Sequence, residues 1–485
     1  MDNSDDSKCS ALPQRVIISF LGFLSIVVSF LMRGCLSIAI TEMVVPMNST
    51  ASSNESINTA PMESSSMDGT RYNWSQEQQG YILSSFFYGY LITHIPGALL
   101  AQKFGGKWTL GLGVLGTTIC NAATPIGVWY GGYVALIILR VMMGLFNGSM
   151  YPALSVLLAC WVPEKERGKL AAFVLGGAQI GFLISFYVSG LILSHFPWPV
   201  VFYFWSGVAA IWFILFALIC YNDPESHPFI SKKELAYLEL EIGQLKRHNN
   251  LPSTPWKEIF TSVPILVLII AQVINDYVFY VLASDLPKYM KEVLKFSVAD
   301  IGFYSSMPYL LMWIVSLVAG FISDHLISGG YVTVTQARKF FGALSSVFPS
   351  ACTLAASYAE YNKTYVVLWL TLCFGFQGCY YAGLRVNILD LSPNYSGPIM
   401  AVINGIASFS GMAAPTFVGM MIPDSTLEQW RLVFIVSFGI SMVRTIIYTV
   451  WASAEIQPWN DRNKSPESKN LTGNTDDCMI KEILE

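Results

Sequence analysis

Charged residues are scarce in this chain. Asp, Glu, Lys and Arg make up 12% of its 485 residues, whereas they make up about 25% of a typical soluble domain. Hydrophobic residues make up 53%, and the mean hydropathy is +0.50. The formal net charge is only −4, and no basic block with interleaved aromatic residues is present. This composition argues against a soluble protein and against nucleic-acid binding, and it predicts a membrane protein.

Sequence motifs for chemistry are also missing. The nine cysteines include no CxxC pair, so we interpret them as small core residues and expect neither a metal site nor a disulfide framework. The chain has no GxxxxGK[ST] nucleotide-binding loop, no HExxH zinc motif and no credible Ser–His–Asp set among its five histidines. We therefore expect a protein that is not an enzyme and that needs no cofactor and no metal.

Long apolar segments fill most of the chain. A membrane-spanning helix needs about 20 largely apolar residues, and twelve segments meet this requirement. They cover approximately residues 16–44, 80–101, 108–128, 130–160, 170–194, 200–221, 263–287, 302–326, 337–358, 364–388, 396–421 and 431–453. The predicted fold is therefore an all-α membrane protein with twelve transmembrane helices.

The polar stretch 222–262 lies between the sixth and seventh segments. It divides the chain into two six-helix bundles, residues 16–221 and 263–454, which form two pseudo-repeats. Within it, Ser231-Lys232-Lys233-Glu234 is a capping-box pattern before LAYLELEIGQL, which predicts an amphipathic helix. Residues 1–15 and 455–485 are polar tails, and we expect the second tail to be disordered.

Lysine and arginine in the short loops predict the orientation, because they concentrate on the cytosolic side of a membrane. They cluster in the central stretch and in the short loops on the same side of the membrane. We therefore expect this side, and with it both termini, to be cytosolic. The stretch PKYMKEVLKF is a local exception. The first outer loop, 48–79, carries glycosylation sequons at Asn48, Asn54 and Asn73. Neither tail has an obvious acidic dileucine pattern, which favours the plasma membrane over the lysosome or a vesicle.

Polar residues interrupt three of the predicted helices near their middles. A charge at the bilayer centre costs about 2.5–3.5 kcal/mol on insertion scales, so it normally faces a cavity or a partner. In RVMMGLFNGSMYP, the seven-residue spacing of Arg140 and Asn147 places both on nearly the same helix face. The candidate substrate-binding residues are Arg33, Arg140, Asn147, Asn275 and Tyr277.

Each of these residues also has a structural interpretation. Arg140 can brace helices by binding carbonyl groups or a hydroxyl, and Asn275 and Tyr277 can form ordinary interhelical hydrogen bonds. Asp276 requires a partner or a proton at this depth. It is our candidate for coupling transport to a proton or sodium, and the alternative is that it neutralises Arg33 or Arg140 across the cavity.

Several long segments resemble one family, and they occur in its order along residues 16–460. They are RGCLSIAI, YNWSQEQQGYILSSFFYGYLITHIPGALLAQKFGGK, RVMMGLFNGSMYPAL, WVPEKERGKL, PWPVVFYFW, DLPKYMKEVLKFSVADIGFYSSMPYL, NGIASFSGMAAP and AEIQPW. The family is the anion transporters that include sialin, the vesicular glutamate transporters and the sodium-dependent phosphate cotransporter-like proteins. The resemblance implies the major facilitator fold, with transport of organic anions or phosphate.

The resemblance also implies roles for single residues. Arg33 matches the family's arginine in helix one, which is associated with anion binding, and Arg140 matches its arginine in helix four. Asn147 stands where sialin-like and glutamate-type members have a carboxylate linked to proton coupling. Asn275 and Leu83 replace an arginine and a histidine of the vesicular glutamate type. These departures favour the phosphate and organic-anion branch.

Three further residues are candidates for gating or conformational change. Gly320 and Asp324 keep the Gly-x-x-x-Asp of the superfamily's loop signature, which the first half of the chain lacks. Arg385 is close to the cytosolic end of the tenth segment, so its side chain can extend to the membrane–water interface. This explains an arginine at that position as well as a functional role does. Asp390 follows shortly after it, and an ion pair between the two is one interpretation.

The sequence therefore predicts a secondary transporter that moves organic anions or inorganic phosphate by alternating access, driven by membrane potential or sodium. In this prediction Arg33 holds the anion, and Asn147 and Asn275 donate hydrogen bonds to it. One alternative is a proton-coupled, sialin-like exporter of acidic sugars or amino acids from an organelle, and another is an anion channel. The expected partners are a small anionic substrate and the lipid bilayer, with no nucleic acid, and the expected state is a monomer.

Overall fold

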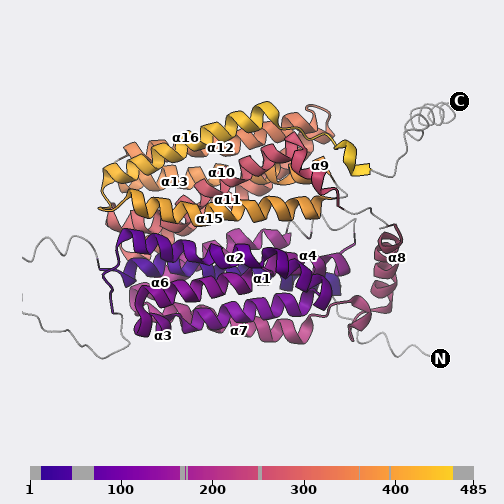
Figure 1. The fold of residues 1–485 in the computed structure, drawn as a ribbon, viewed down its shortest axis with the longest axis horizontal. Coiled ribbons are helices and arrows are strands. Elements are labelled where there is room, and N and C mark those ends of the chain that lie inside the picture. Colours follow the sequence, from indigo (N-terminus) through magenta and orange to yellow (C-terminus); the bar gives the residue numbers. More distant parts are fainter. Residues whose placement is uncertain are drawn as a thin grey trace, which may run out of the picture.

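The computed structural model describes residues 13–45, 70–163, 170, 173–248, 254–359, 361–392 and 395–461. Within these ranges the regular secondary structure is helical, apart from one isolated bridge between Val44 and Tyr72. Figure 1 shows two bundles side by side, formed by the two halves of the chain. The all-α fold predicted from the sequence is confirmed.

The N-terminal half consists of α1 (Gln14–Met43), α2 (Gln76–Phe104), α3 (Gly106–Asn147), α4 (Met150–Trp161), α6 (Gly177–His195) and α7 (Pro199–Ile219). Helix α3 folds back on itself at Gly132, whose φ of 57° and ψ of −142° are not helical. A Cβ atom on Gly113 would lie 2.7 Å from the carbonyl oxygen of Phe146, which places the two arms of α3 side by side. The positive φ explains why a glycine occupies this turn, because a residue with a Cβ atom would clash with its own backbone there.

The C-terminal half consists of α10 (Val263–Glu292), α11 (Val298–Ser328), α12 (Val334–Tyr358), α13 (Lys363–Gln377), α14 (Val386–Leu391), α15 (Ser396–Met421) and α16 (Leu427–Trp451). A π-helical turn, η4 (Tyr381–Arg385), precedes α14. Between the halves lie η3 (Pro224–Ser226), α8 (Lys232–His248) and α9 (Trp256–Thr261), and η5 (Pro458–Asp461) follows α16.

Ten helices in the described part of the chain are long and apolar enough to cross a membrane. One of them, Gly106–Trp161, has 56 residues and contains the reversal at Gly132. The 29-residue helix α2 is not among the ten. The number twelve is reached if Gly106–Trp161 crosses twice and α2 crosses once, and it stays a prediction.

Helix α8 lies in the central stretch, and it packs against the start of α1. The sequence pattern placed Glu234 in a capping box at the start of α8, but the Glu234 carboxylate also binds the start of α1. Its oxygens accept hydrogen bonds from the backbone N–H groups of Gln14 (2.9 Å) and Arg15 (3.1 Å), which have no intrahelical acceptor. We call this end of the molecule the α8 end and the opposite end the far end (Figure 1).

The two halves meet closely at the far end. A Cβ atom on Gly190 of α6 would lie 2.6 Å from the Cα atom of Gly302 in α11, so only glycine permits this approach. Glu42, at the end of α1, accepts hydrogen bonds from Arg71 and from Lys291 of α10. These contacts close the cleft between the halves at the far end.

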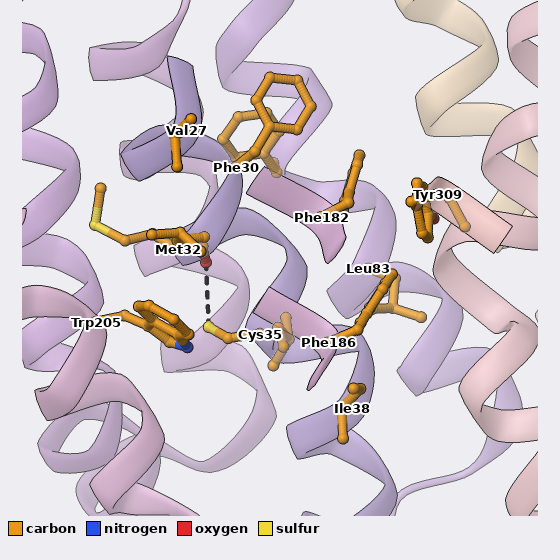
Figure 2. Packing of buried hydrophobic residues seen from close by; sticks show 14 of the residues in the cluster. Val27, Phe30, Met32, Cys35, Ile38, Leu83, Phe182, Phe186, Trp205 and Tyr309 are labelled. Atoms are coloured by element: carbon orange, nitrogen blue, oxygen red, sulfur yellow. Dashed lines mark hydrogen bonds between the residues drawn. The ribbon is translucent and has the colours of Figure 1, made fainter. Parts of the chain in front are cut away.

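Aromatic packing joins the halves further inside the molecule. The rings of Phe182 in α6 and Tyr309 in α11 are stacked with centroids 5.0 Å apart, and Phe186 also contacts Tyr309. Figure 2 shows these rings, with Cys35 and Met32 of α1 on the other side of α6. Offset aromatic pairs contribute about 0.5–1.5 kcal/mol beyond the area they bury. This packing therefore supports the closed far end.

We predict that Gly190→Val separates the halves at the far end. The added methyl groups collide with the backbone of Gly302, and overpacking of this kind costs about 1–3 kcal/mol. Distances between spin labels on α6 and α11 near the far end should become longer. Gly207→Val is the control, because a Cβ atom on Gly207 meets nothing within 4 Å. Identical distance distributions in Gly190→Val and Gly207→Val would contradict the prediction.

Candidate functional site

Aromatic rings surround Arg33 of α1. The central carbon of its guanidinium lies 4.5 Å from the ring centroid of Phe87, 5.0 Å from that of Phe86 and 5.1 Å from that of Tyr280. Phe86 and Phe87 belong to α2, whereas Tyr280 comes from α10 in the other half. Cation–π attraction stabilises a desolvated guanidinium by about 2 kcal/mol. The rings hold Arg33 at the boundary between the halves, and no carboxylate in the described part of the chain forms an ion pair with it.

A small cavity at this boundary contains both predicted arginines. The residues that line it are Arg33, Ser37, Leu83, Phe86, Phe87, Arg140, Phe182, Tyr280, Ala283 and Ser284. Two of these side chains are cationic, and none is acidic. The apolar rings lower the local dielectric constant, which strengthens the attraction for an anion.

Arg140 is 4% exposed, and its hydrogen bonds are poorly satisfied within the described residues. Its Nη1 atom is 4.0 Å from the sulfur of Met143, a weak acceptor, and its Nε atom has no partner there. The bracing interpretation required bonds to carbonyl groups or a hydroxyl, and no such bond from Arg140 is found among the described residues. A buried guanidinium without a counterion is costly, so an anion in the cavity would stabilise it.

The other predicted binding residues do not line this cavity in the present conformation. Asn147 is buried at the end of α3. The side-chain amide of Asn275 donates to Asp276 Oδ1 at 3.2 Å, and the Asn275 side-chain oxygen has no partner among the described residues. Tyr277 packs edge-to-face on Phe417. The structure therefore brings together Arg33 and Arg140, and it places the other three outside the cavity.

Asp276 lies in a hydrogen-bonded cluster within the C-terminal half. Its Oδ1 atom accepts from Gln272 at 2.8 Å as well as from Asn275, and the hydroxyl of Tyr380 donates to Gln272 at 2.7 Å. Arg385 and Arg444 attract it electrostatically. Its electrostatic partners therefore include two arginines of its own half. The described residues contain no hydrogen bond or ion pair from Asp276 to Arg33 or Arg140.

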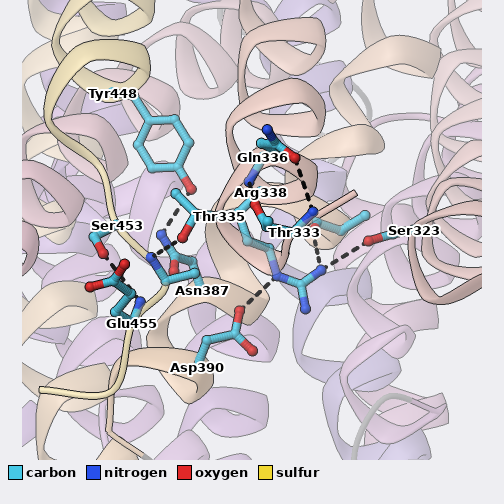
Figure 3. A network of polar contacts seen from close by, with 12 residues as sticks. Ser323, Thr333, Thr335, Gln336, Arg338, Asn387, Asp390, Tyr448, Ser453 and Glu455 are labelled. Atoms are coloured by element: carbon cyan, nitrogen blue, oxygen red, sulfur yellow. Dashed lines mark hydrogen bonds and ion pairs between the residues drawn. The ribbon is translucent and has the colours of Figure 1, made fainter. Parts of the chain in front are cut away.

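Arg385 and Asp390 do not pair with each other, which corrects one interpretation of the sequence. Arg385 donates from Nη1 to the side-chain oxygen of Asn404 at 2.7 Å. Asp390 instead accepts from Nε of Arg338 at 2.7 Å (Figure 3). Arg338 belongs to α12 and lies 52 positions before Asp390 in the sequence, and the fold brings the two side chains together.

Arg338 connects three transmembrane segments of the C-terminal half. Besides binding Asp390, its Nη1 atom donates to Ser323 of α11 at 2.9 Å and to the carbonyl oxygen of Ala382 in η4 at 3.0 Å. Asp324, beside Ser323, is exposed at the α8 end. The network holds α11, α12 and η4 together, which favours movement of this half as a unit.

The predicted glycosylation sites are only partly covered by the structure. Asn73 is exposed at the far end, just before α2. Asn48 and Asn54 lie outside the described residues.

Some residues of the site were missed by the sequence analysis. Arg444 is 3% exposed in α16 and donates to the hydroxyl of Ser345 at 3.0 Å. The cost of an intramembrane charge would have identified Arg444, because it interrupts an apolar segment. The rings of Phe86, Phe87 and Tyr280 carry no comparable signal, since aromatic residues are common in any apolar helix.

We predict that Arg338→Ala destabilises the protein. Loss of its hydrogen bonds leaves Asp390 and Ser323 without their partner, and hydrogen bonds to charged groups contribute about 1.5–3 kcal/mol. The melting temperature of the purified protein in detergent should fall. Lys339→Ala is the matched control, because Lys339 makes an exposed hydrogen bond to the backbone of Val450. Equal melting temperatures for Arg338→Ala and the wild type would contradict the structural role.

Comparison with known proteins identifies the family of the chain. The sequence profile described as the Major Facilitator Superfamily matches residues 22–415. Human sialin is 34% identical over 458 residues, which cover 93% of this chain and 91% of sialin. Vesicular glutamate transporter 1 of Bos taurus is 32% identical over 469 residues, covering 96% and 81%. A Drosophila melanogaster protein, provisionally named an inorganic phosphate cotransporter, is 33% identical over 461 residues, covering 92% and 86%.

Solved structures share the fold. A bacterial homologue of the human lysosomal transporter Spinster, in an inward-facing and occupied conformation, has a TM-score of 0.70 at 13% identity, covering 93% of this chain and 100% of that chain. A D-xylose–proton symporter has a TM-score of 0.66 at 14% identity, covering 92% and 99%. The profile match and the relatives together establish that this multi-pass membrane protein belongs to the Major Facilitator Superfamily, in the family that contains sialin and the vesicular glutamate transporters.

Proposed function

We propose that this protein is a secondary transporter that moves organic anions or inorganic phosphate across a membrane by alternating access. The observation that carries the proposal is the cavity between the halves, which holds Arg33 and Arg140 and no acidic side chain. A guanidinium presents a planar fork of donors that fits a carboxylate or a phosphate. Binding of one anion would relieve the unpaired charge of both arginines.

The transport cycle follows from the contacts that close the far end. With the halves joined there, substrate enters and leaves the cavity from the α8 end. Rocking of the halves breaks the contact of Gly190 with Gly302 and the pairing of Glu42 with Lys291, and the cavity then opens to the far end. The ion pair is partly exposed, and such pairs contribute only about 0–1 kcal/mol, so it allows reversible opening.

The proposal includes an orientation, a location and a monomeric state. The α8 end faces the cytosol, because the basic loops of the sequence gather there, and both termini lie on that side. The plasma membrane is the proposed location. The chemistry is binding and release, so the proposed protein is not an enzyme.

A proton-coupled exporter in an organelle membrane is the second candidate function. It is favoured by Asp276, a carboxylate within a membrane-spanning helix that accepts hydrogen bonds from two amides. Asn147, in contrast, is an amide and neither binds nor releases a proton in a transport cycle. The proposed driving force is therefore membrane potential or sodium, with Asp276 as the residue that would carry proton coupling in the alternative.

We predict that Arg33→Ala lowers anion transport by at least about tenfold. Charged hydrogen bonds contribute about 1.5–3 kcal/mol, which corresponds to a loss of tenfold or more in kcat/KM. Uptake of labelled phosphate, urate and aromatic carboxylates into proteoliposomes measures the effect. Arg431→Ala is a matched control, because Arg431 binds the backbone oxygen of Ser357 away from the cavity. Normal uptake by folded Arg33→Ala would remove Arg33 from the site.

We predict that an inside-positive membrane potential drives anion uptake into proteoliposomes and that a pH gradient alone drives little. The reason is the amide at Asn147, which leaves the helix-four position without a titratable group. Unlabelled anion inside the vesicles should accelerate uptake of labelled anion, which distinguishes a carrier from a channel. Concentrative uptake driven by protons at zero potential, and lost in Asp276→Asn, would establish the second candidate instead.

A further inference from the structure

His227 lies in an aromatic cage at the α8 end, directly after η3. Its ring centroid is 4.8 Å from that of Tyr221 and 5.5 Å from that of Trp161 at the end of α4, both edge-to-face. The backbone there is a loop, yet the His227 side chain is only 6% exposed. A buried polar side chain needs hydrogen-bond partners, so the partners of His227 determine which of its protonation states the cage accepts.

The hydrogen bonds of His227 fix the position of its proton. Nδ1 accepts a hydrogen bond from the backbone N–H of Phe229 at 3.2 Å, so Nδ1 carries no proton. The neutral ring therefore carries its proton on Nε2, which is buried and has no hydrogen-bond partner among the described residues. A second proton has to be added at Nδ1, where it would face the N–H group of Phe229. Because two donors do not form a hydrogen bond with each other, protonation of the ring breaks the bond to Phe229.

Among the described residues, charged groups on two other helices act on His227. Lys107, at the start of α3, disfavours a protonated imidazole, whereas Glu234 of α8 favours it. Glu234 is itself paired with Arg15 of α1 at 3.1 Å. Burial lowers the pKa of His227 from its ordinary value of 6.5, and Lys107 adds to this effect. The backbone of Ile219 and the carboxylate of Glu234 oppose the lowering without reversing it, so the ring is neutral at neutral pH.

The loop segment 221–234 joins four helix ends of the N-terminal half. It follows α7 in the chain, and the backbone oxygen of Tyr221 accepts a hydrogen bond from Nε1 of Trp161 in α4 at 2.9 Å. The side-chain oxygen of Asn222 accepts from a backbone N–H group at the start of α3 at 2.8 Å. Glu234 binds the first N–H groups of α1. Release of this segment therefore removes a common brace from the α8 end of the N-terminal half.

We propose that His227 makes the segment 221–234 a pH-sensitive latch at the α8 end of the protein. The neutral ring keeps the latch closed through its hydrogen bond to Phe229 and its packing in the cage. Acidification on that side of the membrane protonates Nδ1, the hydrogen bond breaks, and the latch opens. The N-terminal half then moves less well as a unit, so transport slows. This regulation goes beyond the proposed function, because the proton controls the rate and does not drive the substrate.

Hydrogen–deuterium exchange of the full-length protein in detergent tests the latch. The wild type and His227→Asn are compared at about pH 7.5 and about pH 5.5, on either side of the ordinary histidine pKa. Asparagine keeps an acceptor for the N–H of Phe229, two residues later, and does not titrate. Relative to His227→Asn at the same pH, exchange of wild-type peptides within 221–234 should rise by about five- to tenfold at the lower pH, because the open latch binds a proton more readily.

Three further variants serve as controls. His325→Asn and His94→Asn remove histidines outside the cage, one exposed at the α8 end and one buried in α2, and both should keep the wild-type response. His227→Phe fills the cage without an acceptor for the N–H of Phe229, so its segment should exchange faster than that of the wild type even at neutral pH. If His227→Asn does not fold, exchange of the wild-type segment is corrected for the intrinsic rate at each pH and compared with that of α16. The segment should then lose protection at the lower pH, and α16 should not.

Exchange of labelled phosphate or benzoate across proteoliposome membranes, with equal pH on both sides, measures the effect on transport. The wild-type rate relative to that of His227→Asn should fall at the lower pH, and a constant ratio would overturn the control of transport by the latch. Equal deuterium exchange in the two proteins at both pH values, or a pH response that persists in His227→Asn, would overturn the latch and leave anion transport standing. A latch that responds to pH in a protein that transports no anion would overturn only the proposed function.

Discussion

Burial of arginine side chains without enough carboxylates is the constraint on which the rest of this structure depends. A buried guanidinium is stable only when partners replace its lost hydration. Arg338 satisfies this demand inside the protein, with a carboxylate, a hydroxyl and a carbonyl oxygen. Arg33 has aromatic rings, and Arg140 has a methionine sulfur. The fold therefore divides its arginines into those that brace helices and those that line the cavity, to which the proposed function assigns the anion.

The closed far end combines tight packing with weak polar contacts. Gly190 and Gly302 bring two backbones together, and the aromatic rings of Phe182 and Tyr309 fill the space next to them. The ion pair of Glu42 with Lys291 is partly exposed, so water replaces it at little cost. Because this ion pair is weak, the proposed balance between open and closed states is sensitive to a bound anion.

The apolar segments and the polar central stretch predicted the helices and the division into halves, because hydrophobic length is a local property of the sequence. Arg33 and Arg140 were also identified, since an intramembrane charge is conspicuous. Tertiary contacts were not predictable in this way. The sequence suggested an ion pair of Asp390 with the nearby Arg385, but in the fold Asp390 binds Arg338, which is 52 positions away. The π-helical turn before α14 likewise has no sequence pattern of its own.

Charge in the cleft also determines how transport is linked to energy. Asn147 is an amide, so protonation cannot alter the charge of the helix-four position during the cycle. Arg33 and Arg140 keep their charge, because a guanidinium does not lose its proton in proteins. Binding of an anion is then the event that changes the charge of the cavity between the halves. In the proposed mechanism, a carrier whose occupied and empty cavities differ in charge in this way moves net charge with its substrate, and membrane potential acts on it directly.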